Sequence, residues 1–226
     1  MSNEYLDWKA DDLQFRAFEF AENKHKGQIR KYTGEPYIVH PSSVRDIITT
    51  HMSNIEPIFA FSPLDVATIQ AIALLHDTVE DTNTTFLDIE NEFGIYVRNM
   101  VYWLTNVSQP EMGNRAFRKN IDLQHTLQSP IEAICIKMAD VIDNCKDIVQ
   151  REFDMDEPST FAKRYLNEKM TFLKAIWKEK KTRLEPYIET IDSNKSFQYN
   201  CWLKVFDSLY SECRNTVESQ LELIKD

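Results

Sequence analysis

Histidine and acidic side chains follow directly on one strongly apolar stretch. Residues 71–75 (AIALL) are apolar at every position and predict a helix segment that lies deep in a core. His76 and Asp77 come next, and a buried ionisable group is costly unless it is paired or binds a metal. Imidazole and carboxylate together offer nitrogen and oxygen ligands for a divalent ion. One turn further on, Glu80 and Asp81 provide two carboxylates for proton transfer, although acids at this helix end could also simply face water.

Two further candidate ligands lie elsewhere in the chain. His40 precedes Pro41, a residue suited to the first turn of a helix, so the histidine has a fixed position at a helix start. Asp140 lies in an apolar helical segment with Lys137 three residues before it, on the same helical stripe. The alternatives are a structural histidine at 40 and a plain ion pair between Lys137 and Asp140.

Taken together, these groups predict a metal-dependent phosphohydrolase. Two imidazoles and two carboxylates suit manganese, iron or zinc and leave coordination positions for water. The metal would generate hydroxide near neutral pH, with Glu80 and Asp81 transferring protons. Arg30 and Lys31 lie in the loop before His40, where their charges could hold phosphate oxygens. The chain has neither a GxGxxG nor a Walker A sequence, which argues against a dehydrogenase or a P-loop kinase.

The elements that must position these residues are predicted to be helices. Four glycines in 226 residues, 42% hydrophobic residues and no sustained period-two pattern favour an all-α fold. Proline, glycine and capping residues place expected helices at about 11–26, 41–51, 63–76, 85–93, 96–104, 130–144, 158–183 and 195–226, the last being one helix or two, and a further helix is expected to start near Arg115. His25 and His51 fall at helix ends, where favourable helix-dipole interaction or exposure explains them better than metal binding.

The amino-acid composition limits the kinds of binding partner and the cellular location that we expect. The formal net charge of −10 leaves no basic surface for general nucleic-acid binding, so an anionic substrate must be held by a local site. We find no long apolar span and no signal peptide, and therefore expect no membrane helix and a cytoplasmic location. The four cysteines show no CxxC spacing and are expected to be reduced thiols rather than a zinc site. Aromatic residues in 195–226 predict core packing or a subunit contact, which permits a homodimer.

The motifs resemble a known family. The segment 27–41 (GQIRKYTGEPYIVHP), the pairs His76-Asp77 and Glu80-Asp81, and the segment 137–144 (KMADVIDN) occur in the order seen in HD-domain alarmone hydrolases. These are the hydrolase half of the bifunctional alarmone synthetase/hydrolases and the stand-alone small alarmone hydrolases, including the metazoan kind. The resemblance covers about residues 13–150. It implies an HD-domain helical bundle, which we expect to form one domain over 1–226 with a C-terminal helical extension at about 158–226.

The resemblance also implies residue roles, which we list by function. The implied manganese ligands are His40, His76, Asp77 and Asp140. The implied catalytic acid pair is Glu80 and Asp81. The implied nucleotide contacts are Arg30, Lys31 and Asn144, to which we add Lys137 on the same helical stripe.

The activity implied is hydrolysis of guanosine 3′,5′-bis(diphosphate) and its pentaphosphate relative. The 3′-diphosphate would be released as pyrophosphate, leaving GDP or GTP, through attack by metal-bound hydroxide. One alternative is another HD phosphohydrolase, acting on an adenosine alarmone or on the 2′-phosphate of NADPH. A second alternative, a non-catalytic nucleotide-binding module, predicts the loss of a ligand or of the acid pair, and all six positions are present.

Overall fold

Helices make up almost all of the regular structure. The computed structural model describes every residue except 1–2, 32, 57–59, 153–159 and 225–226. The α-helices are α1 (Asn3–Lys24), α2 (Val39–Ser53), α3 (Pro63–Leu75), α4 (Thr78–Asp81), α5 (Phe86–Leu104), α6 (Arg115–Gln128), α7 (Ile131–Glu152), α8 (Thr160–Glu179), α9 (Glu185–Tyr187) and α10 (Ser193–Leu223). A short 3-10 turn, η1 (Pro110–Met112), precedes α6, and a π-helical turn, η2 (Lys180–Leu184), joins α8 to α9. The described residues contain no strand, only one isolated bridge between Ile29 and Pro36, so the all-α prediction is confirmed.

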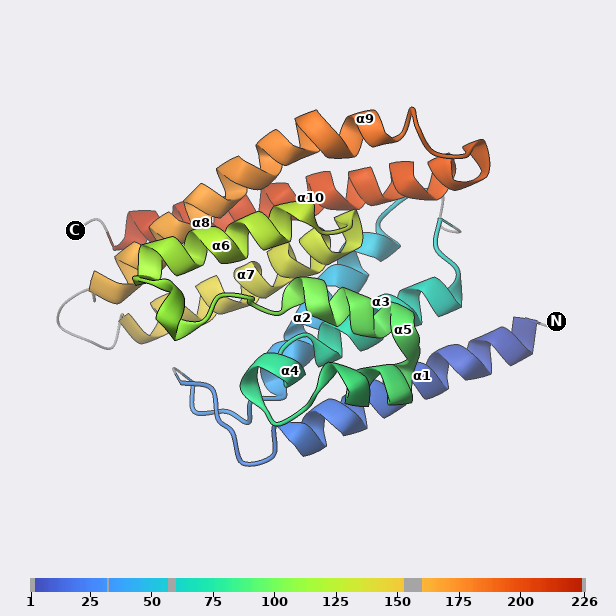
Figure 1. The fold of residues 1–226 in the computed structure, drawn as a ribbon, viewed down its shortest axis with the longest axis horizontal. Helices are drawn as coiled ribbons and strands as arrows, with labels where there is room; N and C mark the ends of the chain where they lie inside the picture. The colour runs from blue at the N-terminus through green and yellow to red at the C-terminus, as the bar shows by residue number, and fades with distance from the viewer. Residues whose placement is uncertain (1–2, 32, 57–59, 153–159, 225–226) are drawn as a thin grey trace.

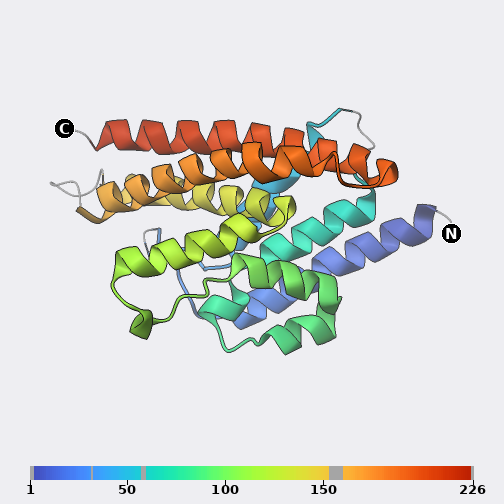
Figure 2. The same cartoon turned by 45° about the horizontal axis from the view of Figure 1, so that its top comes forward.

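The helices form two groups that meet at α2 and α7 (Figures 1 and 2). In the first group α1 lies along α3, and α3 packs on α2. In the second group α10 packs along α7, with α8 beside both. Because α2 contacts α7, the residues at the start of α2 come close to those in the middle of α7.

Helix α3 is buried as the sequence predicts. Ser62 and Asp65 form a capping box, and Pro63 occupies the first helical position. The five residues 71–75 have no exposed surface. The end of this helix therefore carries His76 and Asp77 into the protein interior.

Helix α7 lies on the other side of the buried region that His76 and Asp77 enter. It begins after Ser129-Pro130, as predicted, and its apolar residues around Asp140 are buried. All four cysteines are buried and free: Cys135, Cys145, Cys201 and Cys213.

The structure departs from the sequence predictions at several helix ends. The first helix starts at Asn3 rather than near Asp11, so the residues from Asn3 to Ala10 are helical as well. By contrast, the predicted stop at Gly94 is confirmed: its φ of 86° breaks α5 into two helical stretches, which match the separate helices expected at 85–93 and 96–104. The predicted start of the C-terminal extension at Pro158 lies outside the described residues, and the last segment is one helix, α10.

His51 lies at a helix end, one of its two predicted settings, but it is buried rather than exposed. It lies in the last turn of α2, where α10 covers it. Its Nδ1 lies 2.7 Å from Ser208 Oγ, and its Nε2 lies 2.9 Å from Glu212 Oε2. Ser208 is 157 residues away along the chain, so no local sequence pattern indicates this contact. Among the described helices, none is long and apolar enough to cross a membrane.

Candidate metal centre and adjoining pocket

Four side chains from three parts of the chain converge between α2, α3 and α7. His40 Nε2 lies 3.3 Å from Asp140 Oδ1 and 3.4 Å from Asp77 Oδ2. His76 Nε2 lies 3.0 Å from the same Asp77 oxygen and 4.0 Å from Asp140 Oδ1. One ligand atom each of His40, His76 and Asp77 fall within 4.8 Å of one another, as a shared metal ion requires. The structure thus brings together the four residues predicted as ligands.

The hydrogen bonds of the two imidazoles fit metal binding. His76 Nδ1 lies 2.7 Å from the carbonyl oxygen of Ala73, so Nδ1 carries the proton and donates it. Its Nε2 then offers a lone pair to the centre, where it is buried and has no hydrogen-bond partner. His40 donates from Nδ1 to Asp143 Oδ2 at 2.7 Å, which likewise turns Nε2 toward the centre. Outer hydrogen bonds of this kind orient histidine ligands in metal sites.

The charges of the cluster also favour a cation. Burial works against the charged form of His40, yet hydrogen bonds to Asp140, Asp143 and Asp77 outweigh it and raise the pKa of His40. Burial likewise opposes ionisation of Asp77 and Asp140, but His76 and His40 beside Asp77, and Lys137 beside Asp140, hold the pKa of each carboxyl below its usual value. The carboxylates thus attract positive charge strongly, and a divalent ion would take the place of the histidine protons.

Tyr37 joins the metal cluster to the predicted acid pair. Its hydroxyl lies 2.7 Å from Asp77 Oδ2 and 2.9 Å from Asp81 Oδ2. Burial and the two carboxylates raise the pKa of Tyr37, so the hydroxyl stays protonated and acts as a donor. It has one proton for two carboxylates, and burial together with Asp77 raises the pKa of Asp81. Asp81 is thus well suited to hold a proton at a position that is linked to the metal cluster through the Tyr37 hydroxyl.

The second acid, Glu80, is held from the other side of the site. Asn106, in the segment after α5, donates from its side chain to Glu80 Oε1 at 2.6 Å and from its backbone to Oε2 at 3.1 Å. Both carboxylate oxygens are therefore fixed. This contact aligns Glu80 within the short helix α4.

The four predicted substrate contacts have different surroundings. Lys137 Nζ lies 2.9 Å from Asp140 Oδ2, and Asn144 Nδ2 donates to Asp140 Oδ1, so both belong to the immediate surroundings of the cluster. Lys31 is exposed, with its ammonium 5.6 Å from the ring centre of Phe161.

Arg30 has the least expected surroundings. Its side chain is only 6% exposed, and its guanidinium is paired with Asp143 at 2.6 Å and Asp147 at 2.5 Å. Because Asp143 also accepts from His40, Arg30 supports a ligand from behind. Its contact with phosphate stays a prediction, and this geometry favours a supporting role.

Three residues of the site were not singled out from the sequence. Tyr37 lies inside the segment 27–41. Its position three residues before the predicted ligand His40 could have marked it as a residue of the site. Asp143 lies three residues after Asp140, on the same side of α7. Asn106 carries no sequence signal, because its role depends on the path of the chain after α5.

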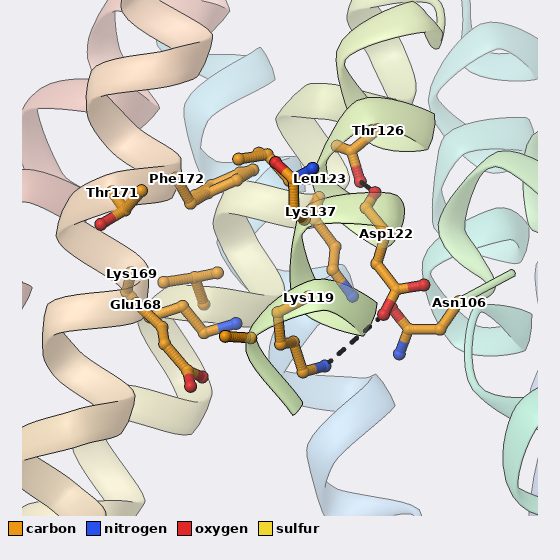
Figure 3. A pocket seen from close by; sticks show the side chains of 13 residues that line it. Asn106, Lys119, Asp122, Leu123, Thr126, Lys137, Glu168, Lys169, Thr171 and Phe172 are labelled. Atoms are coloured by element: carbon orange, nitrogen blue, oxygen red, sulfur yellow. Dashed lines mark hydrogen bonds and ion pairs between the residues drawn. The ribbon is translucent and has the colours of Figure 1, made fainter. Parts of the chain in front are cut away.

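A pocket adjoins the cluster between α6, α7 and α8 (Figure 3). Lys119, Lys137 and Lys169 point their ammonium groups into its polar part, and Leu123 and Phe172 line its apolar part. Lys137 and Asn106 belong to the pocket lining and also contact Asp140 and Glu80. The pocket therefore opens next to the predicted metal ligands and the acid pair. It suits a molecule with both anionic and apolar parts.

The fold and this centre define a helical protein of the HD domain class. The HD domain family matches residues 17–166, and the chain belongs to this family. The chain is 41% identical over 138 residues to the guanosine-3′,5′-bis(diphosphate) 3′-pyrophosphohydrolase MESH1 of Xenopus tropicalis, covering 60% of this chain and 69% of that protein. It is 38% identical over 133 residues to the Homo sapiens protein of the same name, covering 58% of this chain and 67% of that protein.

Two further comparisons extend this picture. A guanosine-3′,5′-bis(diphosphate) 3′-pyrophosphohydrolase of Aquifex aeolicus (strain VF5) is 38% identical over 142 residues, covering 62% of this chain but only 18% of that protein. A solved structure described as a metazoan ortholog of SpoT that hydrolyzes ppGpp matches with a TM-score of 0.52 and 24% identity. It covers 94% of this chain and 93% of that one, so the fold extends beyond the motif region.

Proposed function

We propose that the chain is a metal-dependent pyrophosphohydrolase of guanosine 3′,5′-bis(diphosphate) and its pentaphosphate relative. The reaction releases the 3′-diphosphate as pyrophosphate and leaves GDP or GTP. The observation that carries this proposal is the junction at Lys137, where a buried His/Asp cluster meets a lysine-lined pocket. The names of the relatives from Xenopus tropicalis and Homo sapiens support the choice of substrate.

The four residues His40, His76, Asp77 and Asp140 would hold a divalent ion, for which we propose Mn²⁺. When bound, such an ion polarises a phosphoryl oxygen and lowers the pKa of a coordinated water. The buried Nε2 of His76, which forms no hydrogen bond and lies 3.0 Å from Asp77 Oδ2, and the outer hydrogen bond from His40 to Asp143 support this ligand set.

The acid pair would move the protons. Asp81, linked to the cluster through Tyr37, is placed to accept a proton from the attacking water. Glu80 is held by Asn106 at the edge of the pocket, where it would deliver a proton to the 3′ oxygen as the bond breaks. The raised pKa of Asp81 brings it closer to the working pH, which favours general acid–base catalysis.

The remaining groups would bind and orient the nucleotide. Lys137 is fixed by Asp140 and would hold a phosphoryl oxygen of the group to be cut. Asn144, which donates to Asp140, would keep that ligand aligned. Phe172 and Leu123 would cover the apolar face of the nucleoside. Lys31 stays a proposed contact at the outer edge of the site.

The test is pyrophosphate release from guanosine 3′,5′-bis(diphosphate) by protein that is first stripped of metal and then given Mn²⁺. We expect release that depends on the ion, is lost in Asp77→Ala, and is kept in the exposed control Asp46→Ala. Folded, manganese-loaded protein that releases nothing would exclude this substrate. In that case the adenosine alarmones and NADPH are the substrates to assay next.

Three further proposals concern the setting of this activity. We infer a cytoplasmic location, no nucleic-acid partner, and a homodimer as the state to test by sedimentation. The net charge of −10 supports the absence of a nucleic-acid partner. Of the aromatic residues that suggested a subunit contact, Trp202 and Phe206 are buried within the chain itself, Tyr199 and Tyr210 are partly buried, and Phe197 is exposed.

A further inference from the structure

Lys169 is a cation without an anionic partner in the pocket wall. It lies on α8 and lines the pocket, with its ammonium 4.7 Å from the ring centre of Tyr165. Its neighbour Glu168 is already engaged, because Arg115 binds both of its carboxylate oxygens at 2.9 and 2.8 Å. Within the described part of the chain, Lys169 forms no ion pair and no hydrogen bond through its ammonium.

The surroundings of Lys169 disfavour its charge when the pocket is empty. Burial lowers the pKa of Lys169, and the positive charge of Lys137 lowers it further, which together outweigh the opposite effect of Asp140. Lys119, from α6, adds a third positive charge to the same space (Figure 3). A buried charge without a counter-ion is destabilising, so an anion that enters this space gains from relieving the repulsion.

The three lysines are not equivalent. Lys137 is paired with the predicted ligand Asp140 at 2.9 Å, and Lys119 has Asp122 at 3.9 Å. Among the described residues Lys169 has no such contact with a carboxylate, so it can bind an anionic ligand without giving up an ion pair. It also lies beyond residues 17–166, the part of the chain matched by the HD domain family.

We propose that Lys169 binds a second anionic group of the substrate, the phosphate that is not cut. This inference rests on the proposed function, because the phosphate to be cut must lie at the His/Asp cluster beside Lys137. A phosphate at the other end of the nucleoside then reaches the part of the pocket lined by α8. Lys169 would therefore select a nucleoside that carries phosphate at both its 3′ and 5′ positions.

Two substrates distinguish binding of the 5′ phosphate by Lys169 from a general effect of this residue on substrate binding. Guanosine 3′,5′-bis(diphosphate) carries both groups, whereas guanosine 3′-diphosphate lacks the 5′ group. We expect Lys169→Met to raise KM for the first substrate roughly 10- to 100-fold, the loss typical of a charge-assisted hydrogen bond, and to leave KM for the second unchanged. Lys169→Arg should restore most of the loss, and Lys174→Met, an exposed lysine on α8, is the matched control.

A binding measurement tests the same idea without catalysis. We expect metal-free protein to bind GDP in calorimetric titrations, and Lys169→Met to weaken that binding by a similar factor while Lys174→Met does not. Equal GDP affinity in the two variants, or an equal rise of KM for both substrates in Lys169→Met, would overturn the proposal. Loss of pyrophosphate release with GDP binding that still depends on Lys169 would instead overturn the proposed reaction and keep this binding site. Unchanged circular dichroism and melting temperature would verify that each variant is folded.

Discussion

Arg30 and Asp143 form a buried ion pair across 113 residues of sequence, with Nη1 2.6 Å from Oδ2. The same carboxylate oxygen accepts a hydrogen bond from His40 Nδ1 at 2.7 Å. The loop before α2 and the middle of α7 are thereby connected directly behind a predicted metal ligand. This link explains why a loop arginine is nearly inaccessible to solvent.

Replacing Arg30 distinguishes support from substrate binding. We expect Arg30→Met to lower the free energy of unfolding by about 3–5 kcal/mol, because Asp143 and Asp147 lose their shared partner while they remain largely buried. Denaturant unfolding measures this loss, with the surface residue Arg214→Met as control. An unchanged stability with a raised KM would instead show that Arg30 contacts phosphate.

Tyr37→Phe removes one oxygen and keeps the ring in place. The hydroxyl bridges Asp77 and Asp81, so we expect about a 10- to 100-fold loss in Mn²⁺ affinity or in kcat, as for other outer-shell partners. Metal titration and steady-state kinetics measure the two effects separately. Tyr187→Phe, at an exposed position on α9, should change neither. Full activity and full metal affinity in Tyr37→Phe would contradict the bridging role.

Glu80→Gln tests proton transfer by a side chain that Asn106 holds in place and that is not a predicted metal ligand. We expect kcat to fall about 10²- to 10⁴-fold with Mn²⁺ affinity unchanged, since the amide keeps the size of the side chain but cannot donate a carboxylic proton. Glu90→Gln, an exposed residue on α5, serves as the matched control. If Mn²⁺ affinity falls together with kcat, Glu80 acts through the metal site instead.

The stability of the metal-free protein should depend on pH in two opposite ways. The folded-state pKa values of Asp77 and Asp140 are lowered, so their contribution is present above about pH 4 and is lost as pH falls through the folded values. The folded-state pKa values of His40 and His76 are raised, so their contribution is present below about pH 6.5 and is lost as pH rises through the folded values.

Mn²⁺ should reverse the second trend. The ion binds neutral imidazole, so the rise in melting temperature on adding Mn²⁺ should grow between about pH 6 and pH 8. Thermal unfolding with chelator and with Mn²⁺ across this range gives both curves. A rise that does not change with pH would show that the histidines are not ligands. Asp77→Asn should abolish most of the Mn²⁺ effect at every pH.

The sequence by itself determined the elements and most of the chemistry. The apolar run 71–75 is buried because no face of that segment is polar, and Ser62-Pro63 and Ser129-Pro130 set helix starts through local capping and backbone rules. The identities of His40, His76, Asp77 and Asp140 likewise limit the ligand chemistry to imidazole nitrogen and carboxylate oxygen. Local order and side-chain type are readable from sequence, because they depend on neighbours within a few residues.

The tertiary structure alone decided which charges are already paired. Arg30 and Lys31 are adjacent in sequence, but one is buried against Asp143 and Asp147 and the other is exposed. His51 is covered by α10, and Glu80 is fixed by Asn106, two contacts that depend on how distant helices pack. An ion pair between residues a hundred positions apart leaves no periodic pattern in the sequence. Its existence depends on the packing of whole helices, which also determines whether a lysine such as Lys169 faces a partner or an open pocket.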